Sequence, residues 1–398
     1  MVTREKFFGT LRQSLGAYAF NVCGVFAGSV VAFYLGLFSM APWVIAVYPG
    51  VVSARGVIGG LLSGRLSTAF HIGTMRPRFF NNTESFYLLF KAVTVLTLET
   101  SVGMSLIAFL FGAFLWRATL MDLFAVLSVI VATMALALVI VSPLTMVVSF
   151  ISFRRGLDPD IILYPVESTV SDVLITLCYV SVLSLFFLNN AFGFSIIILL
   201  CLTQTVSALW FLQRNLKKKE FVKTLKESFF TLIFVAFIVN ITGSVLGKIS
   251  EIIGARREIY AVYPALIDTI GDIGAVIGST ATTKLALGTL EPSLSAVGNH
   301  MNEIIGAWTA SIIMFVIYST LSLLLQGILT PDIFIRFTSL LLTANISAAS
   351  SIIAISWTVS IFTFRGGLDP DNFVIPIESS LADSITTISL FVALALIA

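Results

Sequence analysis

Two stretches of the sequence carry the same pattern of acidic residues, and their carboxylates are the groups best suited to bind a cation. The first stretch reads RGLDPDIILYPVESTVSD and ends at Asp172, and the second reads GGLDPDNFVIPIESSLAD and ends at Asp383. A constant offset of 211 positions pairs Glu167 with Glu378 and Asp172 with Asp383. Each stretch opens a long apolar segment, and a carboxylate at bilayer depth costs roughly 2.5 to 3.5 kcal/mol. We therefore expect each carboxylate to face a partner, water or an ion.

The two aspartates each lie on a polar stripe of an otherwise apolar predicted helix. The stripes consist of Thr169, Asp172 and Thr176 in the first copy and of Ser380, Asp383 and Thr387 in the second. If the stripes face each other, the aspartates cannot both stay ionised unless a cation lies between them or one takes a proton. A hydrated Mg²⁺ fits, because it keeps part of its water shell and needs only one or two carboxylates. The alternative is that the aspartates cap helices or bond to neighbouring hydroxyls.

Further acidic residues extend this candidate metal site. Glu167 and Glu378 would lie about 7 Å nearer the cytoplasm than the aspartates if the helix continues, and would form a second acidic ring. Asp268 and Asp272 share one face of another predicted helix, because they are four positions apart. They act either as further cation ligands or in an internal salt bridge.

The segment that contains Asp268, like its counterpart in the first half, is rich in glycine and follows a Tyr-Pro pair. This composition predicts discontinuous helices that bring backbone close to the pathway at Gly56 and Gly271. Asn21 and Asn240 match each other in two further apolar segments. We expect these amides to join helices by hydrogen bonds, with lining of the pathway as the alternative.

The composition places these residues in a membrane. Of the 398 residues, 58% are hydrophobic and 11% are charged, and the mean hydropathy is +1.02. The apolar runs are much longer than the alternating segments of a β-barrel, so we predict an all-α polytopic membrane protein. The sequence has no nucleotide-binding loop, nucleophile motif, zinc motif or nucleic-acid module, which argues against an enzyme and against a nucleic-acid partner. His71 and His300 fall in predicted loops and do not align, so neither indicates a metal site.

Hydropathy predicts eleven membrane spans. They cover about residues 14–38, 44–66, 85–112, 120–151, 160–188, 193–212, 228–248, 260–284, 302–326, 331–362 and 372–398. The basic run over 214–227 follows the sixth span, and we expect it to lie on the membrane surface as a topology anchor. A cytoplasmic N-terminus puts most Lys and Arg residues on the inner side, which predicts a multi-pass protein of the cell membrane with its C-terminus outside.

The first five and the last five spans are copies of each other. Besides the acidic stretch, Tyr48-Pro49 matches Tyr263-Pro264. The predicted domains are a first five-helix repeat over 1–190, a linker helix with the basic loop over 191–227, and a second repeat over 228–398. The sixth span returns the chain across the membrane, so the repeats would run parallel about a pseudo-twofold axis along the membrane normal. One chain is then a pseudo-dimer, and this arrangement is compatible with a monomer.

These motifs resemble those of the MgtE-type magnesium channels and of their archaeal and eukaryotic solute-carrier relatives with two MgtE-like halves. The similarity rests on DPDNFVIPIESSLAD at 369–383, on its copy at 158–172, and on the segment from Tyr48-Pro49 to GRLST at 64–68. The resemblance implies a pore on the axis between two five-span units, lined by their second and fifth spans. It also implies that the fifth-span aspartates, here Asp172 and Asp383, bind a hydrated Mg²⁺.

The sequence departs from the family pattern at two places. Where the family usually has Gly-Asn after the second-span proline, this chain has Gly56-Val57 and Gly271-Asp272. No segment resembles the cytoplasmic N domain or the CBS domains of bacterial MgtE, so we expect any gating to come from the membrane spans and their loops.

The sequence therefore predicts transport of a divalent cation, with Mg²⁺ as the first candidate and Mn²⁺ as another. Both a channel and a carrier coupled to Na⁺ or H⁺ are compatible with it. One alternative is a proton- or Na⁺-coupled carrier of an organic or anionic solute. Another is a membrane scaffold or enzyme, although the sequence contains no recognisable catalytic constellation.

Overall fold

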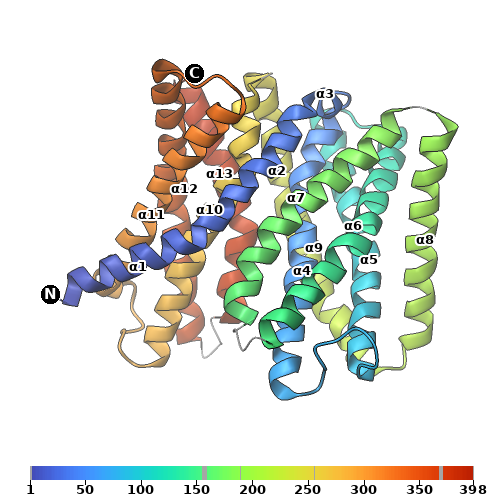
Figure 1. Ribbon diagram of the computed structural model, residues 1–398, viewed down its shortest axis with the longest axis horizontal. Coiled ribbons are helices and arrows are strands. Elements are labelled where there is room, and N and C mark those ends of the chain that lie inside the picture. The colour runs from blue at the N-terminus through green and yellow to red at the C-terminus, as the bar shows by residue number, and fades with distance from the viewer. Residues whose placement is uncertain (1, 155–158, 189, 255, 367–370, 398) are drawn as a thin grey trace. The chain divides into compact units, whose positions relative to one another are not determined.

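All regular secondary structure in the described part of the chain is helical (Figure 1). The computed structural model describes all residues except 1, 155–158, 189, 255, 367–370 and 398. The elements are α1 (Val2–Tyr18), η1 (Ala19–Asn21), α2 (Val22–Phe33), α3 (Leu35–Phe38), α4 (Pro42–Ile72), α5 (Glu84–Leu115), α6 (Leu120–Arg154), α7 (Pro159–Phe187), α8 (Ala191–Asn215), α9 (Lys219–Ile253), α10 (Arg257–Ala286), η2 (Leu294–His300), α11 (Met301–Leu325), α12 (Pro331–Arg365) and α13 (Asp371–Ile397).

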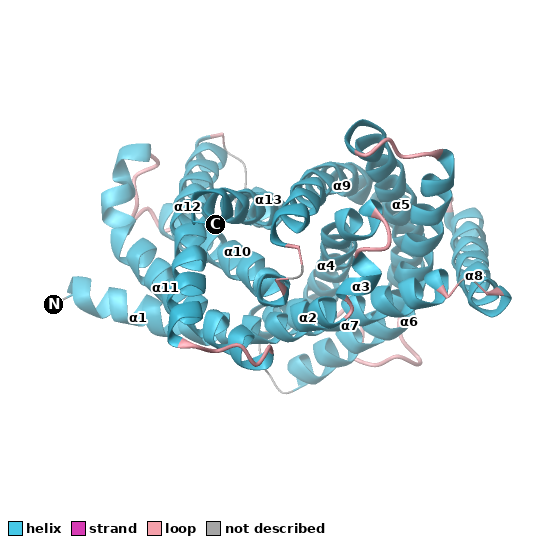
Figure 2. Cartoon of the chain, turned by 90° about the horizontal axis from the view of Figure 1, so that it is seen from above, coloured by secondary structure: helices cyan, strands magenta, loops and turns pink. Residues whose placement is uncertain are grey.

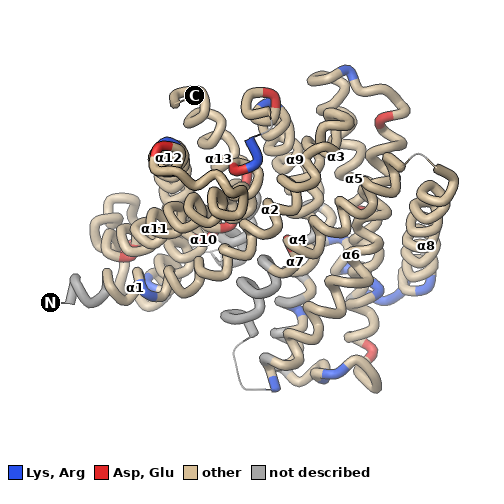
Figure 3. Tube along the Cα trace, turned by 45° about the horizontal axis from the view of Figure 1, so that its top comes forward, with Lys and Arg blue, Asp and Glu red and all other residues tan. Residues whose placement is uncertain are grey.

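Nine segments of the described chain are long and apolar enough to cross a membrane, and two shorter apolar helices lie at Pro42–Ala54 and Leu381–Ile397. Each of these eleven segments overlaps one of the eleven spans that hydropathy predicts. The protein is therefore an all-α polytopic membrane protein, as its composition predicts. Its Lys and Arg residues lie mostly near the ends of helices (Figure 3).

The second span of each repeat is a continuous helix, so the expectation of a discontinuous helix there was wrong. Helix α4 runs through Pro49, and helix α10 runs through Pro264. A proline removes one N–H from the helical hydrogen-bond ladder, and neighbouring groups in a bundle compensate for that loss. The break lies instead in the first span, where the 3₁₀ turn η1 separates α1 from α2.

The basic run over 214–227 extends from the end of α8 into the first turns of α9. Helix α9 begins at Lys219 and continues to Ile253, so most of the run forms the first turns of the helix that contains the seventh span. Phe221 within it is only 1% exposed and packs against Leu88 of α5 and Ala208 of α8. Burial of this apolar face holds the start of α9 against its neighbours, while the lysines of the run remain exposed.

The chain forms two compact units whose limits differ from those of the sequence repeats. One unit comprises Met1–Phe33 with Lys248–Ala398, and the other comprises Tyr34–Gly247. Helices α1 and α2 therefore pack with helices of the second repeat, where α2 lies along α10 and α1 lies along α11 (Figure 2). Helix α9 contains the first span of the second repeat, and most of it packs with helices of the first repeat. The first spans are thus exchanged: each packs with helices of the other repeat.

Glycines permit the close approach of these exchanged helices. A Cβ atom added at Gly24 of α2 would lie 2.9 Å from the backbone nitrogen of Ala265 on α10. A Cβ atom added at Gly243 of α9 would overlap the carbonyl oxygen of Ala46 on α4. Small residues at such contacts let helix backbones meet and strengthen packing inside a membrane.

Candidate cation site

Asp172 lies on α7 in the unit of Tyr34–Gly247, where its side chain is only 7% exposed. One turn further along, Thr176 Oγ1 lies 3.0 Å from the hydroxyl oxygen of Tyr48 on α4. A second bond between the same helices runs from Tyr179 Oη to the carbonyl oxygen of Val44, at 2.6 Å. The second and fifth spans of the first repeat are thus joined by hydrogen bonds beside the buried carboxylate.

Asp383 lies on α13 in the other unit, and its side chain is partly buried. One turn further along, Thr387 Oγ1 lies 2.8 Å from the hydroxyl oxygen of Tyr263 on α10. A Cβ atom added at Gly271 of α10 would lie 3.5 Å from the Cβ atom of Ala382, so α10 and α13 are in close contact next to Asp383. The two aspartates belong to different compact units.

Asp272 takes part in a buried hydrogen-bond network with the first span. Asn21 Nδ2 donates to Asp272 Oδ2 at 2.7 Å and to Thr269 Oγ1 at 3.1 Å. Tyr318 Oη of α11 lies 2.8 Å from Thr269 Oγ1 and donates to the carbonyl oxygen of Tyr18 at 3.2 Å. The network fixes the η1 break against α10 and α11, so Asn21 joins helices as expected of a membrane amide.

The remaining predicted site residues have different surroundings. Asn240 is buried, and its Nδ2 donates to the carbonyl oxygen of Ala236 in its own helix at 2.6 Å. Asp268 lies one turn before Asp272 on α10 and is partly buried. The side chains of Glu167, Thr169, Glu378 and Ser380 and the surroundings of Gly56 lie outside the described residues. Among the side chains that are described, no three His, Cys, Asp or Glu residues lie close enough to hold a metal ion.

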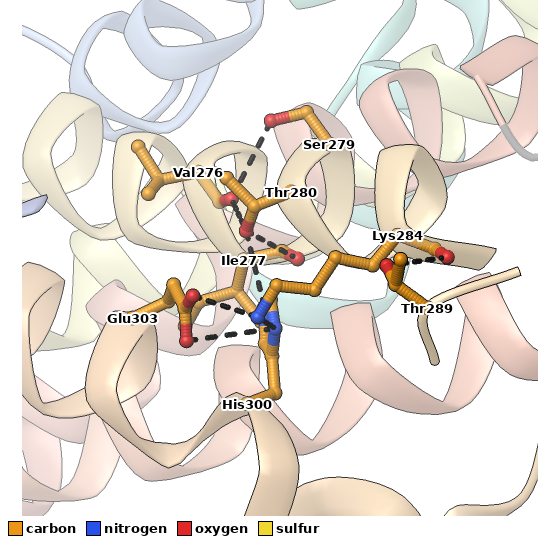
Figure 4. Close-up of polar contacts among 8 residues, drawn as sticks. All are labelled: Val276, Ile277, Ser279, Thr280, Lys284, Thr289, His300 and Glu303. Atoms are coloured by element: carbon orange, nitrogen blue, oxygen red, sulfur yellow. Dashed lines mark hydrogen bonds and ion pairs between the residues drawn. The ribbon is translucent and has the colours of Figure 1, made fainter. Parts of the chain in front are cut away.

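One polar cluster was missed by the sequence analysis, and it lies where α10 ends and α11 begins (Figure 4). Lys284 Nζ donates to Glu303 Oε1 at 2.6 Å and lies 3.0 Å from His300 Nδ1. His300 is fully buried in η2 and stacks on Trp357, with ring centroids 5.5 Å apart. The expectation of a loop histidine was therefore wrong. The spacing of three residues between His300 and Glu303 was the available signal, because it places both side chains on one helical face.

The comparison with protein families gives a match within each of the two repeats. The family model for MgtE, described as a divalent cation transporter, matches residues 48–182 and 263–393. Together these ranges span about two thirds of the chain, and they contain both aspartates and both Tyr-Pro pairs. No curated protein and no solved structure matches this chain significantly.

Proposed function

We propose, from the premise that this chain belongs to the MgtE family of divalent cation transporters, that it transports Mg²⁺ along an acidic pathway to which both repeats contribute. Transport of divalent cations is the property of the family. The choice of Mg²⁺ and the assignment of Asp172 and Asp383 as the principal ligands are our proposal for this chain.

The observation that carries the proposal is a carboxylate, removed wholly or partly from solvent, at the same position of both repeats. Asp172 is 7% exposed on α7, and Asp383 is partly buried at the matching position of α13. Burying an ionised carboxylate is costly unless it is paired or coordinates a metal. Because this acidic position recurs in both repeats of a chain whose family transports divalent cations, we assign both carboxylates as cation ligands.

A hydrated Mg²⁺ suits two such carboxylates. Mg²⁺ loses its water reluctantly, and it is usually held by one or two carboxylates together with several retained waters. Glu167 and Glu378 would add negative charge one to two turns away, and Asp268 and Asp272 would add it on the second span. Polar side chains and glycines complete the proposed lining at Thr169, Ser380, Gly56 and Gly271. Thr176, Thr387, Asn21 and Asn240 are instead buried in the helix packing.

The proposed orientation places the N-terminus in the cytoplasm and the C-terminus outside, with the two repeats parallel. This orientation is supported by the distribution of Lys and Arg residues over the loops. A single chain supplies both aspartates, so a monomer is sufficient for transport in this proposal.

A flux assay with purified protein in liposomes tests the proposal. Uptake of Mg²⁺, Mn²⁺ and Ca²⁺ is measured separately, with and without gradients of Na⁺ and of pH. We expect saturable uptake of Mg²⁺ above that of empty liposomes. Dependence on a Na⁺ or pH gradient would identify a coupled carrier, and flux that follows only the Mg²⁺ gradient would identify a channel. The absence of Mg²⁺ uptake under all gradients contradicts the proposal.

A further inference from the structure

The same tyrosine–threonine hydrogen bond occurs in both units. Tyr48 of α4 contacts Thr176 of α7 at 3.0 Å, and Tyr263 of α10 contacts Thr387 of α13 at 2.8 Å. Each tyrosine directly precedes the proline of the second span, and each threonine follows the fifth-span aspartate by four residues. The two bonds therefore link matching positions of the two repeats, although each lies within its own compact unit.

In the second repeat, a further hydrogen bond of Thr387 shows which hydroxyl donates in the bond between Tyr263 and Thr387. Thr387 Oγ1 donates its single hydrogen to the carbonyl oxygen of Asp383 at 2.6 Å. A hydroxyl group has one donor hydrogen, so Thr387 must accept in its bond with Tyr263. Tyr263 thus donates to Thr387, and Thr387 donates to the backbone carbonyl of Asp383, the proposed cation ligand.

Both bonds lie in dry surroundings. Tyr48 and Tyr263 are each 3% exposed, and Thr176 and Thr387 have no exposed surface. A buried hydroxyl that loses its partner cannot turn to water instead, so the geometry of these bonds is strongly favoured. The following proline weakens its own helix by removing one ladder hydrogen bond, which makes an external attachment at the tyrosine more important for placing the second span.

We propose that Tyr48 and Tyr263 are positioning residues for transport, which set the height and rotation of Asp172 and Asp383 relative to the second span. This inference rests on the proposed function. Residues four apart lie on the same face of a helix, so a bond at the threonine fixes the face that carries the aspartate. The ligand is a hydrated divalent cation, and Mg²⁺ requires near-ideal octahedral placement of its ligands.

The test measures uptake of Mg²⁺ into liposomes as a function of Mg²⁺ concentration. For Tyr263→Phe we expect the concentration that gives half-maximal uptake to rise by about twofold to tenfold, the change that corresponds to losing one hydrogen bond. Thr387→Val removes the same bond and should shift this concentration equally, and the double variant should shift it no further. Thr387→Ser keeps the hydroxyl group and should behave like the wild type. Tyr48→Phe tests the first repeat in the same way.

Tyr179→Phe is the matched control. Tyr179 is fully buried and also ties α7 to α4 through a hydrogen bond of 2.6 Å, but it lies about two turns beyond Asp172 and matches Leu390 in the second repeat. Its loss should lower the melting temperature as much as Tyr48→Phe does and leave the half-maximal concentration unchanged.

The inference is overturned if neither tyrosine variant shifts the half-maximal concentration, or if Tyr179→Phe shifts it equally, because the bonds would then serve stability alone. A wild-type protein that takes up Mg²⁺ while the variants show no shift would leave the proposed function intact. A wild type without uptake overturns the proposed function and this inference with it.

Discussion

Asn21 Nδ2 donates a hydrogen bond of 2.7 Å to Asp272 Oδ2, and this bond joins the broken first span to the helix that carries the second Tyr-Pro pair. The resemblance to MgtE proteins leads one to expect an amide where this chain has Asp272. Here an amide meets the carboxylate from a neighbouring helix instead. Asp272 is thus part of the packing of its unit, whatever its role toward a cation.

Substitutions at this bond separate the packing role of Asp272 from its charge. Asp272→Asn keeps an oxygen that can accept from Asn21, so we expect little change in melting temperature. Asn21→Leu leaves the carboxylate without this donor and should cost about 1 to 3 kcal/mol of stability. Both variants are compared by thermal unfolding in detergent and by Mg²⁺ uptake. Uptake that falls in Asp272→Asn while its stability is retained would assign the carboxylate to the pathway, and unchanged uptake would assign it to packing.

The exchanged first spans give a second prediction. Gly243→Ala places a Cβ atom against the carbonyl oxygen of Ala46, so α9 and α4 must move apart. Overpacking of this kind costs about 1 to 3 kcal/mol, and we expect a clear fall in melting temperature. Gly247→Ala is the control in the same helix, because a Cβ atom added there has no neighbour within 4 Å. Equal effects of the two substitutions would contradict the close contact of α9 with α4.

Two lysine–glutamate pairs of equal length give a third prediction. Lys284 and Glu303 are 2.6 Å apart with side chains 21% and 9% exposed, whereas Lys218 and Glu84 are 2.6 Å apart with side chains 51% and 70% exposed. Lys284→Met removes a donor from a nearly buried carboxylate and should cost about 1.5 to 3 kcal/mol. Lys218→Met should leave the melting temperature unchanged, because solvent screens an exposed pair. If Lys284→Met lowers the melting temperature no more than Lys218→Met does, the buried pair is not a stabilising contact and the prediction is contradicted.

Hydropathy was sufficient to predict the membrane-spanning segments, because a membrane span needs only a long apolar run. The repeat could also be read directly, since the acidic stretch ending at Asp172 returns at Asp383. Neither signal tells which helices become neighbours. The exchange of the first spans depends on contacts such as that of Gly24 with Ala265, which lie 241 positions apart in the sequence.

Local features of the candidate site were predicted less well. A proline and several glycines suggested a break in the second span, but the hydrogen-bond ladder of α10 continues past Pro264. The actual break at η1 contains no proline, and three-dimensional contacts with Thr269 and Tyr318 hold it in place. The partner of Thr387 could not be found from periodicity, because Tyr263 lies on another helix 124 positions away.

The central claim is tested most directly by Mg²⁺ uptake into liposomes by Asp172→Asn, Asp383→Asn and the double variant. Each change removes a charge and keeps the shape of the side chain, and Glu291→Gln serves as the control for an exposed carboxylate. We expect each single variant to lose most of its uptake and the double variant to lose all of it, while melting temperature and helix content stay near those of the wild type. Normal Mg²⁺ uptake by the folded double variant would contradict the account.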